Sequence, residues 1–332
     1  MKRFQWIDEA KGLGILFVML GHCYLEDKFV FWFTSFCMAL FFFLSGYVFH
    51  RKASYQEFLM KKIRTLLIPY LCFAGITMLH NGILAVSHGS EYSVIEILLQ
   101  YLLQIRYTPL WFLPCIFLAE QVLYFMTGLA EGRNRSFWLM GSAIGFTAFF
   151  LYRRFIDMNL LWNADLSILA VSFMCFGKWM SLYFGQKREE GADLWVSAVL
   201  GVCYLVGVVV QFQVFGQVDW YSNRYGNPLL FAIVATLGAV IVMELSRKIS
   251  VPCLAALGRN SILFYALHRL VIDDSFVLYN KLGIDIVDGS MQSLLFGGLS
   301  VAIALCVLMP VNWFVVRFMP VCVGKTYHRG LK

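Results

Sequence analysis

The 332-residue chain has few charged residues: Asp, Glu, Lys and Arg make up only 14% of it, against about a quarter in ordinary soluble domains. Hydrophobic residues make up 60%, and the mean hydropathy is +0.71. The sequence also lacks an internal repeat, a low-complexity tract and any polar stretch long enough to form a soluble domain. These absences exclude a soluble globular protein and predict that the chain works within a membrane domain.

Cysteine pairs and a cleavable leader are also absent. The nine cysteines are scattered singly without a C-x-x-C pair, which argues against a disulfide framework and predicts no metal site. A basic N-terminus precedes the first apolar run, but Asp8, Glu9 and Lys11 interrupt the approach and no A-x-A site follows. We therefore expect a retained first helix rather than a secretory signal.

Apolar segments long enough to cross a membrane recur along the whole chain, and they predict an all-α integral membrane protein with about ten transmembrane helices. The predicted spans are 13–24, 29–49, 63–86, 109–129, 136–151, 160–184, 194–212, 228–246, 260–278 and 292–319. A shorter segment at 94–105 carries Glu96, Gln100 and Gln104, which favours an interfacial or re-entrant helix.

Loop charges predict the orientation, because Lys and Arg accumulate on the cytoplasmic side. With both termini in the cytoplasm, that side receives seventeen of these residues and the opposite side receives six. The net charge of +7 is then explained by topology, and we expect no nucleic-acid partner. Residues 1–320 form the predicted membrane domain, and 321–332 form a short basic cytoplasmic tail.

Three polar residues stand on the first apolar segment. At 100° per residue, Asp8, Lys11 and His22 project from one face of a helix, with Lys11 and His22 about 16 Å apart along its axis. One interpretation is purely structural: Asp8 and Lys11 mark the start of the helix, and His22 forms a hydrogen bond with a neighbouring helix. The functional interpretation is a lined cavity in which neutral His22 acts as a general base, since an ionisable residue at such depth indicates function.

Two further groups lie on the predicted cytoplasmic side. Lys61, Lys62 and Arg64 are either ordinary loop charge or a phosphate clamp, because Lys61 and Arg64 are spaced to hold one anion together. Ser45 belongs to a small-residue pair that permits close helix packing, and Tyr47 offers a hydroxyl near the same surface as Lys11.

A second histidine lies at a similar predicted depth. His268 is about 12 Å from the start of the ninth span at Asn260. His22 and His268 either face one cavity or are unrelated.

Taken together, these segments give the chain a resemblance to the membrane-bound acyltransferase family 3, most closely to its fucose 4-O-acetylase-like branch. The first-helix pattern W-I-D-x-x-K-G-x-x-I-x-x-V-x-x-G-H is matched by Trp6, Ile7, Asp8, Lys11, Gly12, Ile15, Val18, Gly21 and His22. The resemblance continues through Met38 to Tyr47, the basic run into Ile68, Pro69 and Tyr70, and then Leu110, Trp111, Phe112 and Leu113. It ends with Asn227, Pro228, Leu229, Leu230, Leu257, Gly258, Asn260, Ser261, Tyr265 and His268.

Two departures from the family pattern matter. Many members carry Arg where this chain has Lys11, and lysine is usual in the branch named above. That branch usually reads F-H-M-P in the second helix, whereas this chain has Phe36, Cys37, Met38 and Ala39. The second helix is therefore expected to lack a proline kink, and the acceptor role of the missing histidine is open.

The resemblance implies a multi-pass enzyme of a bacterial plasma membrane that moves acetyl from acetyl-CoA, without a metal, to a hydroxyl of an envelope carbohydrate. The catalytic residues would be His22, Lys11 and Asp8. His22 would act either as a general base or as a nucleophile that forms an acyl-histidine. Lys11, Lys61, Arg64, Ser45 and Tyr47 would bind the CoA substrate. Trp111 and His268 would contact the acceptor, and Ser45, Tyr47, Trp111 and His268 are the candidate oxyanion donors.

Two other classes of function stay open at this point. A carrier or flippase for a lipid-linked saccharide would also line its path with polar residues, although transporters often show repeated halves, which this chain does not. A structural subunit of an envelope synthesis complex would leave His22 replaceable.

Overall fold

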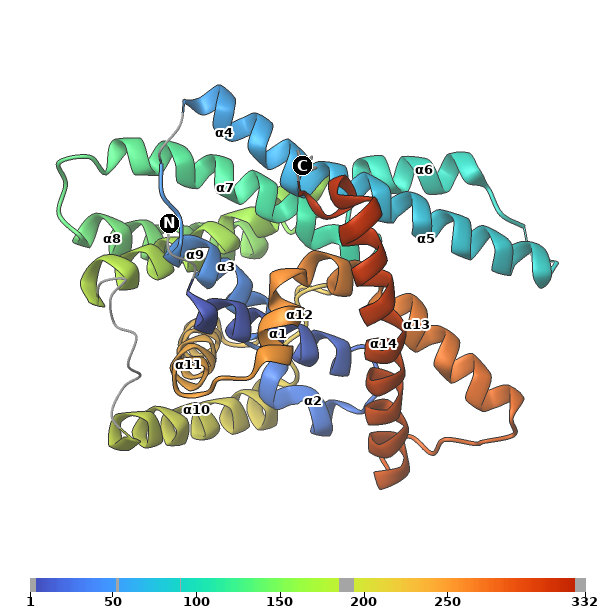
Figure 1. Cartoon of the computed structure of the whole chain (residues 1–332). Helices are drawn as coiled ribbons and strands as arrows, with labels where there is room; N and C mark the ends of the chain where they lie inside the picture. The colour runs from blue at the N-terminus through green and yellow to red at the C-terminus, as the bar shows by residue number, and fades with distance from the viewer. Residues whose placement is uncertain (1–3, 52–53, 90, 185–193, 326–332) are drawn as a thin grey trace.

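The computed structural model describes residues 4–51, 54–89, 91–184 and 194–325, and within these ranges it is helical with no β-strand (Figure 1). The order is α1 Gln5–Leu20, α2 Asp27–Thr34, α3 Cys37–Tyr47, α4 Tyr55–Lys62, η1 Ile63–Leu67, α5 Ile68–Ser87, α6 Val94–Leu103, η2 Pro109–Trp111 and α7 Phe112–Leu129. It continues with α8 Ser136–Phe155, η3 Leu161–Asn163, α9 Ala164–Phe184, α10 Leu194–Phe215, α11 Pro228–Lys248, α12 Pro252–Arg259, α13 Ser261–Lys281, α14 Met291–Phe318 and η4 Pro320–Val323.

The predicted all-α membrane fold is confirmed. Seven helical segments in the described part of the chain are long and apolar enough to cross a membrane, and each coincides with one of the predicted spans. The short segment predicted at 94–105 forms α6, a ten-residue helix that runs back alongside α5 (Figure 1). The predicted tail is described only to residue 325; its last seven residues lie outside the described ranges.

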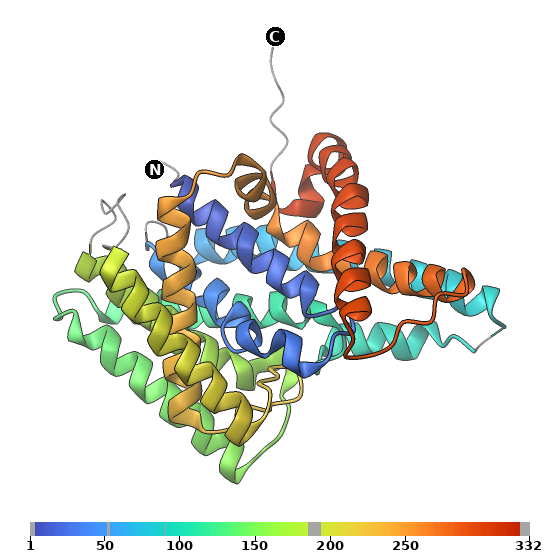
Figure 2. The same cartoon turned by 90° about the horizontal axis from the view of Figure 1, so that it is seen from below.

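Helix α1 occupies the centre of the bundle, surrounded by α3, α11, α12, α13 and α14 (Figures 1 and 2). Its closest neighbour is α12, a helix that was not predicted from sequence. Gly258 of α12 lies against the carbonyl of Asp8, and Gly12 of α1 lies against the carbonyl of Leu254. Small residues permit such close backbone approach between membrane helices. Glu9 also accepts a hydrogen bond from the Val251 N–H at the N-cap of α12 (2.9 Å).

Glycines also join α3 to α9. Gly46 packs against the backbone of Met174, and Gly177 packs against the backbone of Phe43. Each helix therefore presents a glycine to the other, and no side chain separates the two backbones. The small-residue position beside Ser45 is a helix-packing contact in this structure.

The second predicted span is not one continuous helix: α2 ends at Thr34 and α3 begins at Cys37. The prediction of one continuous span at 29–49 was therefore wrong, although the break contains no proline, as expected. The hydroxyl of Thr34 bonds the carbonyl of Phe31, and the thiol of Cys37 bonds the carbonyl of Thr34, so these side chains compete with the helical ladder. The ring of Phe36 fills the space over Gly238 of α11, which gives the break a packing contact.

The third predicted span starts earlier than the sequence indicated. A capping box between Ser54 and Glu57 starts α4 at Tyr55, and the helix continues through η1 into α5. The segment η1 is a π-helical turn, which the missing N–H of Pro69 explains, because proline cannot bond the carbonyl four residues earlier. That carbonyl belongs to Thr65, and Gly324 of the C-terminal segment packs beside it.

The contact between α1 and α12 provides a stability test. In the Gly258→Ala variant, the added methyl group would overlap the Asp8 carbonyl, so α12 must shift. We expect a loss of about 1–3 kcal/mol and a lower melting temperature in detergent, measured by a thermal unfolding assay. Gly201→Ala on α10 is the matched control, since open space surrounds Gly201. Equal melting temperatures for both variants would contradict the packing argument.

Candidate active site

His22 lies in a turn just beyond the end of α1. The helix ends at Leu20, and the N–H groups of His22 and Cys23 then bond the carbonyls of Met19 and Leu20 at 3.1 and 3.2 Å. Tyr24 has a φ of 53°, which a helix cannot continue. The prediction that Asp8, Lys11 and His22 form a stripe on one helix was therefore wrong for His22, because the chain leaves the helix two residues before it.

His22 lines a cavity of about 330 Å³. This volume falls within the range of small-molecule sites. The cavity is bounded by the end of α1, by α2 and the start of α3, by Trp111, and by the loop between α10 and α11. Its walls combine apolar and aromatic side chains with polar ones, and the polar side chains are His22, Asp27, Thr34, Cys37, Gln217, Asp219, Tyr221 and Arg224. Trp111, which was predicted to bind the acceptor substrate, thus lines the same cavity as His22. Cys37, which replaces the histidine of the F-H-M-P pattern, lines it too.

His268 lies directly beside His22, although it comes from α13. The two rings are 4.9 Å apart between centroids and tilted by 38°. The side chain of His268 is fully buried, and its Nδ1 is 3.0 Å from the carbonyl oxygen of Phe264 and 2.8 Å from that of Tyr265. Its Nε2 is buried and has no hydrogen-bond partner among the described residues. His268, which was predicted to bind the acceptor substrate, therefore contacts His22 but does not itself line the cavity.

The loop between α10 and α11 forms the outer wall of the cavity. Asp219 and Arg224 close it with two backbone hydrogen bonds (2.8 and 2.9 Å) and a side-chain ion pair (3.3 Å). Burial raises the pKa of Asp219, but hydrogen bonds from Ser222, Arg224 and the Tyr221 N–H outweigh it and hold this pKa below its ordinary value. Asp219 is consequently an anion at neutral pH, and it pairs with the Arg224 cation in the cavity wall.

Buried polar contacts hold this loop and Trp111 in place. Arg106 pairs with Asp165 at the start of α9 and also donates to the Tyr221 carbonyl at 3.4 Å; the side chains of Arg106 and Asp165 are 3% and 0% exposed. Asn163 donates to the carbonyls of Gln104 and Trp111. The backbone around the cavity is thus fixed by side chains from the ends of α6 and α9.

The predicted cytoplasmic residues lie apart from this cavity. Asp8 is buried and Lys11 is half-buried, both in the first half of α1, and neither lines the cavity of His22. Ser45 and Tyr47, at the end of α3, also do not line it. Tyr47 is buried, its ring meets that of Trp6, and its hydroxyl accepts a hydrogen bond from Arg247 at 3.1 Å.

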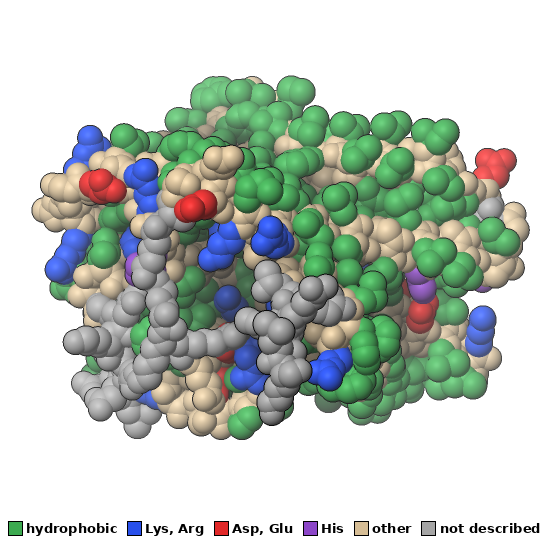
Figure 3. All heavy atoms as spheres, turned by 45° about the horizontal axis from the view of Figure 1, so that its top comes forward, with side chains coloured by type: hydrophobic (Ala, Val, Ile, Leu, Met, Phe, Trp, Pro, Cys, Tyr) green, Lys and Arg blue, Asp and Glu red, His purple; other side chains and the backbone are tan. Residues whose placement is uncertain are grey.

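Lys61 and Arg64 are exposed on α4 and η1, whereas Lys62 between them pairs with Glu120 of α7 at 2.6 Å. Figure 3 brings this face forward and shows Lys and Arg side chains gathered near its middle, within a surface that is otherwise largely hydrophobic. The structure therefore separates two regions: a basic face and the cavity of His22.

Sequence reasoning missed two buried ion pairs. The guanidinium of Arg247 lies over the ring of Trp6, 4.2 Å from its centroid, and pairs with Glu244 at 3.0 Å. Arg106 and Asp165 pair near the cavity. The available signal was the presence of Asp165, Glu244 and Arg247 within or at the ends of apolar spans, because charges there seldom lack a partner.

The described ranges contain neither an assembled metal site nor a disulfide. No group of three or more His, Cys, Asp or Glu side chains there could hold a metal ion. All nine cysteines are free thiols.

A family model described as an acyltransferase domain matches residues 4–310. The match extends from α1 into α14 and includes all the residues that line the cavity of His22. No curated protein and no solved structure matches the chain.

The Arg106–Asp165 pair provides a test of how the cavity is held. Asp165→Asn leaves the buried Arg106 cation without its main partner, so we expect a loss of about 3–5 kcal/mol, measured as a lower melting temperature in detergent. The double variant Arg106→Gln, Asp165→Asn removes the stranded charge and should melt above Asp165→Asn alone. If the stability lost in the double variant equals the sum of the losses in Asp165→Asn and Arg106→Gln alone, the two residues are not a coupled pair.

Proposed function

The chain belongs to acyltransferase family 3, and from this premise we propose that it moves an acetyl group from cytoplasmic acetyl-CoA to a hydroxyl of an envelope saccharide or polysaccharide precursor. It is a multi-pass membrane acyltransferase. We also propose that the protein lies in the plasma membrane of a bacterium. Lys11 supports a place in or near the fucose 4-O-acetylase-like branch of the family. The observation that carries the proposed function is the cavity that holds His22 beside His268.

In the proposed reaction His22 is the general base. It takes the proton of the acceptor hydroxyl as the oxygen attacks the thioester carbonyl, the carbon–sulfur bond breaks, and the proton passes to the departing CoA thiolate. The products are an acetyl ester and CoA. Half-burial of His22 among Phe17, Phe33 and Trp111 supports this role, because apolar walls keep water from the thioester.

His268 is proposed to orient His22 rather than to donate to the oxyanion. Carbonyl oxygens only accept, so the Nδ1 of His268 carries a proton toward Phe264 and Tyr265. In a neutral imidazole the other nitrogen is then an acceptor. The Nε2 of His268 can therefore accept from one nitrogen of His22, which leaves the lone pair of the other nitrogen for the substrate.

An acyl-histidine route would use the same ring as a nucleophile. The two routes differ when no acceptor is present. A protein mixed with radiolabelled acetyl-CoA alone and then quenched retains label on His22 only in the acyl-histidine route.

The CoA nucleotide is proposed to bind the basic face. Lys61 and Arg64 are exposed and can meet phosphate oxygens. Lys11 lies about 14 Å along the helix axis before the end of α1 at Leu20. The pantetheine arm would run along α1 toward His22. The acceptor is proposed to bind on the other side of His22, where Trp111 and Trp220 offer ring faces and Asp27, Asp219 and Arg224 offer hydrogen bonds to sugar hydroxyls.

The proposed base is tested by His22→Ala. We expect the acetyl-transfer rate to fall about 10²–10⁴-fold, measured with labelled acetyl-CoA and envelope glycans in detergent, while the melting temperature stays near that of the native protein. His88→Ala, at an exposed histidine after α5, is the control and should keep the native rate. Native transfer by folded His22→Ala would disprove the mechanism.

The proposed CoA face is tested by charge removal. Lys61→Gln and Arg64→Gln should each raise the KM for acetyl-CoA roughly two- to fivefold, with kcat little changed, because exposed ion pairs contribute modestly. The effect should shrink at high salt. Lys281→Gln, exposed at the end of α13, is the charge-matched control. An equal rise in KM for Lys281→Gln would place the CoA site elsewhere.

A further inference from the structure

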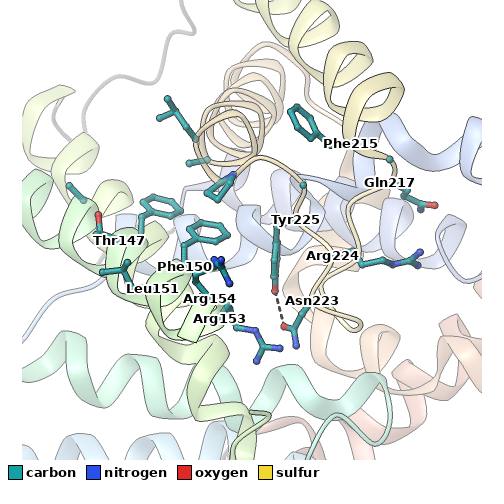
Figure 4. A pocket seen from close by; sticks show the side chains of 17 residues that line it. Thr147, Phe150, Leu151, Arg153, Arg154, Phe215, Gln217, Asn223, Arg224 and Tyr225 are labelled. Atoms are coloured by element: carbon teal, nitrogen blue, oxygen red, sulfur yellow. Dashed lines mark hydrogen bonds between the residues drawn. The ribbon is translucent and has the colours of Figure 1, made fainter. Parts of the chain in front are cut away.

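A second and larger cavity lies between α8 and the segment that joins α10 to α11. It is a groove of about 990 Å³, and its walls are mostly apolar (Figure 4). Phe146, Phe150 and Leu151 of α8 form one side, and Leu229 and Ala232 of α11 form the other. Leu151 and Leu229 are exposed at its edges, so the groove opens on the surface of the apolar bundle.

The groove has a cation that the protein does not neutralise. Arg153 pairs with Asp157 at 2.5 Å and with Asp165 at 3.4 Å. Arg154 has no such partner within the described ranges, and it extends into the groove between Phe150 and Tyr225 (Figure 4). A guanidinium beside an apolar wall fits an amphiphile whose head group carries an oxyanion, and Arg binds phosphate with two parallel hydrogen bonds.

The groove and the cavity of His22 share a wall. Gln217 and Arg224 line both of them. In Figure 4 these two residues lie at one end of the groove, on the side away from Phe150 and Leu151. A molecule with its chain between α8 and α11 can therefore pass Arg154 and Arg224 and present its head group to His22.

We propose that this groove binds the lipid part of the acceptor, which is a saccharide carried on a long-chain lipid phosphate. The chain lies against Phe150 and Leu229, the phosphate binds Arg154, and the saccharide extends past Arg224 into the cavity of His22. This inference rests on the proposed acyl transfer for the identity of the head group. The binding of a lipid phosphate itself can be measured without turnover.

The test uses full-length His22→Ala protein in detergent, so that no reaction occurs. The probe is a prenyl phosphate, compared with the matching prenyl alcohol, inorganic phosphate and a diacyl phosphatidic acid, and binding is followed as a rise in melting temperature. We expect only the prenyl phosphate to stabilise the protein clearly. Adding Arg154→Gln should weaken its binding about tenfold, because one charge-assisted contact is lost. Arg135→Gln, exposed at the other end of α8, should bind it normally.

Each other outcome overturns the proposal. Equal stabilisation by the alcohol means an apolar surface without a phosphate site, and equal stabilisation by phosphatidic acid means a site for bulk phospholipid. Unchanged binding in Arg154→Gln places the phosphate elsewhere. Because none of these measurements depends on acetyl transfer, a failure here is distinct from a failure of His22→Ala to lose activity.

Discussion

The close packing of α1 against α12 is the constraint on which the candidate site depends. Lipid tails are as apolar as the side chains, so helices in a bilayer associate through close packing and polar contacts rather than through burial from water. Gly12 and Gly258 let the two backbones meet, and Glu9 ties α1 to the N-cap of α12. Because α13 follows α12 after a single residue, the same contact sets both the turn that presents His22 and the helix that carries His268.

Hydropathy predicted the helices well because a span must be apolar over its whole length, whatever it packs against. Each predicted span overlaps an observed helix or pair of helices, and α6 matches the short segment at 94–105. Within the described ranges, seven of these are long and apolar enough to cross a membrane, and the count of about ten spans stays a prediction. The sequence did not predict the break at Thr34 or the end of α1, since apolar residues continue through both. These interruptions are set by side-chain hydrogen bonds and by the left-handed conformation of Tyr24, which hydropathy does not record.

Three residues of the candidate site were predictable, but its geometry was not. A histidine within an apolar run was a clear signal, and His22, Trp111 and His268 lie together. The stripe that linked Lys11 to His22 assumed one unbroken helix. Asp219 and Arg224 come from a loop without periodicity, and their place in the cavity depends on Arg106, which reaches the loop from the far end of α6. Long-range contacts of this kind leave no pattern in one sequence.

The end of α1 at Leu20 has a chemical consequence. A side chain inside a helix is flanked by the turns before and after it, whereas a residue in the turn beyond a helix can meet groups from several directions. His22 contacts the ring of His268 on one side and the cavity under Trp111 and Asp219 on another. In the proposed reaction the thioester arrives along α1 and the hydroxyl arrives past Arg224, so a donor and an acceptor from opposite sides of the membrane need one group that faces both. Termination of the helix supplies that position.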